Sequence, residues 1–348
     1  MILQTLSAIY GAAASWRRRW YADPGRRRHL ARPVVSVGNL RVGGSGKTPV
    51  VEYIARLLRD NGEHPVVLSR GYARRAPADG VTVVSDGQTV LADLARAGDE
   101  PLMLARALPG VPVLVGSNRH LSGLLAERRF GATVHVLDDG FQHLELARDV
   151  DLVLVDETDI ADRPMPGGYL REPLANASTA DAALVNAGYA TAAERIGRAL
   201  GVSTVFRVTR ALCAPRMIAT GDSVVVPSGA RVFAVSGIAR PERFPLDLAA
   251  VGWQVVGTLA FRDHYHFHQR DVNRIVAVAS AASASIVLTT DKDAVRLAAC
   301  DLGALPIASV PLAVGVEPAG AFRDWLLERI HAAARTAHVE PRTRRRDP

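Results

Sequence analysis

Short apolar runs alternate with longer amphipathic stretches along most of the chain. Ten runs are rich in Val, Ile and Leu and have the length of buried strands, at residues 33–39, 65–71, 111–116, 133–139, 151–156, 182–186, 204–208, 232–237, 255–261 and 286–290. Helical patterns lie between several of them, such as the apolar positions 50, 51, 54, 57 and 58 before Asn61 and Gly62. Alternating strands and helices form parallel sheets with helices on both faces, so the sequence predicts a largely parallel α/β fold.

The first twenty residues follow another pattern. Their larger side chains recur every three or four positions, at Ile2, Leu6, Ile9, Ala13, Trp16 and Trp20. On a helix within residues 1–22 these side chains share one face. The apolar run is short for a membrane span, and its arginines follow it, whereas in a secretory signal they would precede it. Two interpretations stay open: a helix in the interface of an anionic membrane, or a helix packed on its own domain.

The segment "VGNLRVGGSGKTPV", residues 37–50, joins the first predicted strand to a helix and predicts a P-loop. Its glycines allow backbone N–H groups to face a phosphate, and Thr48 offers a magnesium ligand. The usual pattern has a glycine where Arg41 stands, and Gly43 with Gly44 can supply the missing flexibility. The predicted nucleotide-binding residues are Arg41, Val42, Gly43, Gly44, Ser45, Gly46, Lys47 and Thr48. A glycine-rich structural turn is the alternative.

The alternation of strands and helices breaks near residues 209–230, which indicates a domain boundary. We therefore expect a membrane-interface helix over 1–22, a P-loop domain over 23–212, a smaller C-terminal α/β domain over 213–335 and a basic tail over 336–348. The fold class is then P-loop NTPase-like, with a second α/β domain and an amphipathic N-terminal helix.

The net charge of +7 is concentrated in two arginine-rich stretches, residues 17–32 and 335–347. The rest of the chain is slightly acidic, so no nucleic-acid partner is predicted. Lys47 and Lys292 are the only lysines. Because arginine supplies positive charge everywhere else, a retained lysine indicates a position that needs a compact ammonium group.

Three further motifs have more than one interpretation. Asp138 and Asp139 end an apolar strand, where a P-loop fold holds magnesium, although an acidic pair at a strand end is more often a turn. Asp99, before a predicted helix, reads by itself as a helix-start carboxylate. The alternating histidines of "FRDHYHFHQRD" are compatible with a metal cluster, an ordinary loop, or a single histidine that accepts a proton.

Taken together, these motifs resemble the tetraacyldisaccharide 4′-kinases, the lipid A 4′-kinase family of Gram-negative bacteria. The resemblance rests on "GNLRVGGSGKTP", "SRGYARR", "GDEPLML", "LDDGFQH", "GGYLREP", "FRDHYHF" and "TTDKDAVRL", which follow one another between about residues 33 and 297. The family's loop also lacks the first glycine. Departures from the family pattern occur at Ala73, Gly167, Tyr169 and Asp291.

The resemblance implies that the chain uses ATP and Mg²⁺ to phosphorylate the 4′-hydroxyl of a tetraacyldisaccharide 1-phosphate, giving lipid IVA. This lipid disaccharide substrate lies at the cytoplasmic face of the inner membrane, so a peripheral association is expected there. The roles implied are Lys47 on the phosphates, Thr48, Asp138 and Asp139 at the metal, Asp99 and His264 as the catalytic dyad, and Arg171 and Glu172 on the substrate side.

A P-loop ATPase that switches a membrane partner is the alternative function. A guanine-specific switch would carry [NT]-K-x-D, whereas "TTDKDA" places Asp293 directly after Lys292. The pattern argues against GTP and leaves an ATP-driven switch open.

Overall fold

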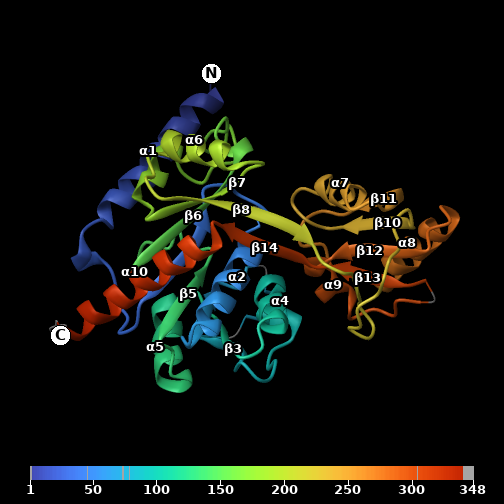
Figure 1. Ribbon diagram of the computed structural model, residues 1–348, viewed down its shortest axis with the longest axis horizontal. Coiled ribbons are helices and arrows are strands. Elements are labelled where there is room, and N and C mark those ends of the chain that lie inside the picture. The colour runs from blue at the N-terminus through green and yellow to red at the C-terminus, as the bar shows by residue number, and fades with distance from the viewer. Residues whose placement is uncertain (1, 45, 73, 78, 304, 340–348) are drawn as a thin grey trace.

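The computed structural model describes residues 2–44, 46–72, 74–77, 79–303 and 305–339, which form two α/β domains side by side (Figure 1). The N-terminal and C-terminal helices both lie on the first domain, the larger of the two. Ser45, Ala73 and residues 340–348 of the predicted tail lie outside the described residues.

Nine strands form the sheet of the first domain, in the spatial order β14, β8, β7, β6, β1, β5, β2, β4, β3. Neighbours are parallel except at the two edges, where β14 is antiparallel to β8 and β3 is antiparallel to β4. In chain order these strands are β1 Val34–Asn39, β2 Pro65–Ser69, β3 Thr82–Ser85, β4 Val113–Val115, β5 Val134–Asp138, β6 Val150–Asp156, β7 Ala182–Asn186, β8 Val205–Leu212 and β14 Leu312–Glu317.

Helices cover both faces of this sheet (Figure 1). On one face α2 (Lys47–Asp60), α4 (Asp99–Ala107) and α10 (Ala319–Val339) share one apolar core with the strands. On the other face α5 (Arg119–Phe130) and α6 (Ala190–Leu200) pack in two smaller clusters. Shorter helical turns are η1 Pro24–Arg26, α3 Leu94–Ala97, η2 Glu157–Asp159 and η3 Leu174–Thr179.

The second domain has a five-stranded sheet in the order β11, β10, β12, β13, β9, in which only β9 is antiparallel to its neighbour. Helices α8 (Gln269–Ala281) and α9 (Asp291–Leu297) pack on one face and α7 (Arg243–Ala250) on the other. The strands are β9 Arg216–Met217, β10 Arg231–Ser236, β11 Gln254–Ala260, β12 Ile286–Thr290 and β13 Ile307–Val310.

The predicted α/β class is confirmed, and each of the ten predicted strands is present. The predicted extent of the second domain, residues 213–335, is wrong at its end. Strand β14 returns to the first sheet and pairs with β8, and α10 packs into the core of the first domain. Two antiparallel strands, β8 and β14, therefore connect the domains, a pairing that joins residues about a hundred positions apart.

Helix α1 (Ile2–Trp20) lies along the outside of the first domain (Figure 1). Its packed face is narrow and made of small residues: a Cβ atom added at Gly11 would come within 3.1 Å of Pro173 Cγ, and Ser7 Oγ accepts a hydrogen bond from Gly167 N. The six residues of the predicted apolar face are all exposed. Helix α1 therefore packs on its own domain through one face, while its apolar face stays exposed, and the membrane interface remains a prediction.

No helix among the described residues combines the length and the apolar character needed to cross a membrane.

Candidate active site

The loop between β1 and α2 has the backbone of a phosphate-binding turn. Gly43 and Gly46 adopt φ angles of 92° and 78°, a region that glycine occupies without steric cost. Helix α2 begins at Lys47, and its buried second residue is Thr48. The first N–H groups of a helix and its positive end favour an anion at this position.

Arg41 anchors the first arm of this loop to a distant part of the chain. Its Nη1 donates to Asp162 Oδ2 at 2.6 Å and to Asp159 Oδ1 at 3.3 Å, and its guanidinium lies 4.7 Å from the centre of the Tyr169 ring. The backbone N–H of Val42 donates to the carbonyl of Tyr169. The side chain that replaces the usual glycine and the backbone of Val42 thus hold the loop in place, which leaves the backbone of the glycines to face a phosphate.

Asp138 ends β5 beside the P-loop strand and is buried. Its Oδ2 accepts a hydrogen bond from Ser69 Oγ at 3.0 Å. Burial raises the pKa of Asp138 to about 7, and the nearby charges of Glu100 and Asp139 add to this rise. A buried carboxyl among other carboxylates is an environment that a divalent cation would neutralise.

Asp139 is more open, with 35% of its side chain exposed, and connects two cations. Lys47 Nζ lies 3.3 Å from its Oδ1, and Arg171 Nη1 lies 2.8 Å from its Oδ2. Burial would raise the pKa of Asp139, but the charges of Lys47 and Arg171 outweigh burial and lower it. Lys47 also donates to Asn39 Oδ1 at 3.0 Å, so the lysine bridges the two neighbouring strands β1 and β5.

The residues suit a magnesium ion. One hydroxyl, from Thr48, and two carboxylates, from Asp138 and Asp139, are the oxygen donors that Mg²⁺ prefers. Among the described residues no three or more His, Cys, Asp or Glu side chains form a complete metal cluster. This agrees with the chemistry, because magnesium at a phosphate site takes only one or two protein carboxylates and completes its shell with water and phosphate oxygens.

Asp99 and His264 meet where the two domains face each other. Asp99 begins α4, and His264 follows β11 with a φ of 57°, a left-handed conformation that is uncommon outside glycine and is held by its surroundings. His264 Nδ1 lies 2.9 Å from Asp99 Oδ2. Burial would raise the pKa of Asp99, but the hydrogen bond with His264 and the charge of Arg296 lower it overall. Asp99 is therefore a carboxylate that orients the ring.

The other two histidines of the motif have different surroundings. Residues 261–268 form a turn and extended loop, so the three side chains do not share the face of a strand. His266 Nε2 lies 3.1 Å from Arg75 Nη1, and His268 caps the start of α8. Only His264 of the three contacts Asp99.

Arg171 and Glu172 are neighbours that serve different parts of the structure. Arg171 contacts Asp139 and, at 3.1 Å, Gln142 Oε1. Glu172 is 3% exposed, and its two oxygens accept from Arg18 Nε at 2.9 Å and Nη2 at 2.8 Å. The segment thus connects the aspartate pair to helix α1, and Arg18, one of the arginines that follow the apolar run of this helix, is buried.

We expect Arg18→Ala to lower the free energy of unfolding by about 3–5 kcal/mol, because it leaves the buried Glu172 carboxylate without its bidentate partner. Urea denaturation followed by circular dichroism measures this loss. Arg19→Ala, an exposed change one residue away, is the matched control and should have little effect. Equal stability of the two variants would contradict the structural importance of the pair.

Basic side chains that were not predicted as site residues lie beside the aspartate pair. Arg119 begins α5 and is buried. Burial lowers the pKa of Arg119, the charge of Asp138 raises it, and the charge of Arg70 lowers it further. Burial, with the charge of Arg119 as the next contribution, lowers the pKa of His143 to about 4, so this ring is neutral at pH 7. Arg70 belongs to the "SRGY" motif, and this motif is the signal in the sequence by which these basic residues could have been found. These guanidinium groups could hold an anionic group of a substrate.

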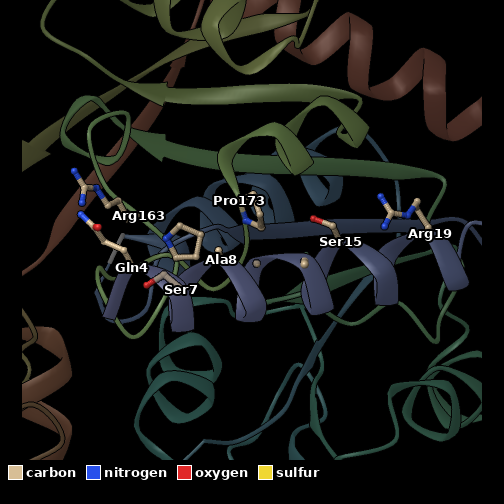
Figure 2. Close-up of a pocket in the computed structure, with 10 residues that line it drawn as sticks. Gln4, Ser7, Ala8, Ser15, Arg19, Arg163 and Pro173 are labelled. Carbon is tan, nitrogen blue, oxygen red and sulfur yellow. The ribbon is translucent and has the colours of Figure 1, made fainter. Parts of the chain in front are cut away.

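A groove of about 510 Å³ runs along α1 (Figure 2). Ser7, Ala8 and Ser15 line it from the helix, and Pro173 lies opposite them. Arg163 lies toward one end and Arg19 toward the other. The groove is open at the surface and lies beside the contact between α1 and Pro173.

A family model described as "Tetraacyldisaccharide-1-P 4'-kinase" matches residues 1–331 of the chain. Two relatives named tetraacyldisaccharide 4′-kinase illustrate the similarity. The protein of Syntrophus aciditrophicus (strain SB) is 37% identical over 94% of this chain and 92% of its own length. That of Desulfotalea psychrophila is 42% identical over 78% of this chain and 80% of its own length.

A solved structure is also similar, the "apo" form of LpxK from Aquifex aeolicus in complex with ATP. It superposes with a TM-score of 0.74 at 31% sequence identity, covering 94% of this chain and 98% of that one.

Proposed function

The chain belongs to the tetraacyldisaccharide-1-P 4′-kinase family, and from this premise we propose how its residues divide the work of phosphoryl transfer. The protein is a lipid A 4′-kinase, which uses ATP to phosphorylate the 4′-hydroxyl of a tetraacyldisaccharide 1-phosphate and gives lipid IVA. The ATPase switch considered as an alternative is not favoured, because the family's reaction has a lipid-sugar acceptor.

The P-loop domain binds and neutralises the transferred phosphate. The backbone of Gly43, Gly44 and Gly46 and the start of α2 face the phosphates, and Lys47 reaches their negative charge. Thr48, Asp138 and Asp139 would hold Mg²⁺, which when bound would offset the negative charge of the phosphate oxygens. Arg171 keeps Asp139 in position through their 2.8 Å contact.

Asp99 and His264 form the base that receives the acceptor's proton. Asp99 accepts a hydrogen bond from the Nδ1–H of His264, so Nε2 of His264 is the nitrogen available to the 4′-hydroxyl. The single observation that supports this assignment is the 2.9 Å contact between two residues from different domains. Arg296 Nε lies 3.1 Å from the same Asp99 oxygen, Oδ2, and places a second positive charge beside this carboxylate.

An acceptor-dependence assay tests the function directly. We expect ADP formation to require the lipid disaccharide 1-phosphate and to match its phosphorylation one to one. ATP hydrolysis that continues at the same rate without the lipid, or with a different membrane protein as the stimulant, would favour the ATPase switch.

The finer proposal is that the enzyme works at the cytoplasmic face of the inner membrane, with α1 in the interface. Each exposed apolar side chain of α1 can contribute roughly 1.5–3 kcal/mol to the free energy of membrane binding when it is fully buried. Partial burial and the ordering of the side chains reduce this contribution. Arginines near an anionic surface add about 1 kcal/mol each. Trp16 and Trp20 lie at the helix end, with the Arg26 guanidinium 3.6 Å above the Trp20 ring, an arrangement suited to a headgroup region. The groove beside α1 is then open to an acyl chain of the substrate.

We expect high salt to release part of the protein from membranes. Replacing Ile2, Leu6 and Ile9 together by Gln should weaken attachment further and raise KM for micelle-presented substrate more than it lowers kcat. These substitutions test the interface better than deletion of residues 1–20, because the deletion also removes Arg18 from buried Glu172. Sedimentation with vesicles and lipid-dependent kinetics measure both effects.

The control replaces three exposed apolar residues outside α1, Val225, Leu246 and Val251, by Gln. It should sediment with vesicles as the wild type does. A wild-type protein that resists both salt and alkaline carbonate would contradict interfacial binding in favour of insertion. One that stays in the supernatant at low salt would mean that α1 only packs on its own domain.

A further inference from the structure

Lys292, one of the two lysines of the chain, lies directly against the proposed base. It is in the first turn of α9, and 16% of its side chain is exposed. Its Nζ lies 3.2 Å from His264 Nε2, 3.1 Å from Asp263 Oδ1 and 3.3 Å from Glu100 Oε1. The ammonium thus contacts the nitrogen that the proposed reaction requires, on the side of the ring opposite Asp99.

The two partners of the ring together specify one protonation state. An ionised carboxylate such as Asp99 can only accept a hydrogen bond, so Nδ1 carries the hydrogen. An ammonium can only donate, so Nε2 presents its lone pair to Lys292. A proton on Nε2 would place an N–H against the ammonium, with two like charges in contact.

Asp263 has the opposite influence. Its Oδ2 lies 3.8 Å from His264 Nε2, where a carboxylate by itself would favour the protonated ring. Lys292 pairs with Asp263 Oδ1 and offsets that charge. The ionisable groups around the ring are Asp99 and Glu100 from α4, Asp263 from the loop after β11, Lys292 and Arg296 from α9, and Tyr72 and the Arg75–His266 pair at the edge.

We propose that Lys292 is a positioning residue that donates a hydrogen bond to His264 Nε2 and so holds the lone pair of this nitrogen for the acceptor hydroxyl that replaces it. The inference rests on the proposed role of His264 as the base and extends it. When the 4′-hydroxyl arrives, its proton moves to Nε2 in place of the hydrogen bond from Lys292, its oxygen forms the bond to the γ-phosphorus, and ADP leaves with the electrons of the broken bond. Lys292 keeps its carboxylate partners Asp263 and Glu100.

The test is the pH dependence of kcat at saturating ATP and lipid substrate, for Lys292→Met, Lys292→Arg and Asp263→Asn. We expect the acid limb of Lys292→Met to move to higher pH by roughly one unit, because the like charge that opposes protonation is gone. Lys292→Arg keeps the charge and should stay closer to the wild type. Asp263→Asn should move the limb to lower pH. Shifts of opposite sign distinguish this role from a structural one, and Asp263→Asn keeps the test informative if Lys292→Met does not fold.

Acid limbs of Lys292→Met and Asp263→Asn that coincide with the wild type would overturn the inference. So would a rise of tenfold or more in KM for ATP in Lys292→Met with the limb unmoved, because Lys292 would then be a phosphate ligand. If His264→Ala loses activity in these cases, the proposed base stands and only the role of Lys292 fails. If His264→Ala keeps near-wild-type kcat, the base assignment fails and this inference with it.

Discussion

Lys47→Ala is expected to lower kcat by roughly 100-fold to 1,000-fold, the scale of losing one main electrostatic group at a transition state. In the proposed mechanism the lysine neutralises charge that develops on the transferred phosphate, and no other lysine or arginine belongs to the glycine-rich segment after Arg41. Its contacts with Asn39 and Asp139 place the ammonium at the loop before any nucleotide binds. Steady-state kinetics with saturating ATP and lipid measures the loss.

The variant should fold normally, because Lys47 lies at a helix start and not in an apolar core. Circular dichroism and the thermal midpoint serve as controls, and Arg56→Ala, an exposed change on the same helix, should keep full activity. A folded Lys47→Ala enzyme with near-wild-type kcat would mean that the loop is only a structural turn.

Asp99→Ala and His264→Ala are each expected to slow transfer by roughly 100-fold to 10,000-fold. The double variant should be scarcely slower than the poorer single variant, because groups that act as one unit lose their effect together. The 2.9 Å contact between His264 Nδ1 and Asp99 Oδ2 is the structural basis of this coupling. The measurement is kcat for the four enzymes of the cycle.

His266→Ala is the matched control, since His266 lies in the same loop but contacts Arg75 and not Asp99. It should retain activity close to that of the wild type. Losses at Asp99 and His264 that multiply in the double variant would show that the two residues act independently.

Several features depend on local sequence and could be predicted from it. The P-loop needs glycines, a lysine and a helix start within a few residues, so the segment around Lys47 was recognisable on its own. The ten strands follow from runs of β-branched residues, and the exposed apolar face of α1 follows from a spacing of three and four residues. Four strands of the described residues were not predicted. Three of them, β3, β9 and β14, lie at sheet edges, where the apolar pattern is weaker and the pairing comes from elsewhere in the chain. The fourth, β13, is a buried strand of four residues inside the second sheet.

The tertiary structure decided which distant residues pair, both in the proposed catalytic site and in the buried ion pair of α1. By spacing alone the three histidines were equivalent, and the family resemblance, not the pattern, singled out His264. Asp99 and His264 are 165 residues apart, Arg18 and Glu172 are 154 apart, and Glu100 and Lys292 are 192 apart. Sequence periodicity reports which face of a local element is apolar, but it contains no information on which distant element packs against that face. Only docking the second domain on α4 brings His264 and Lys292 to Asp99, so the site's chemistry arises from contacts that no single segment encodes.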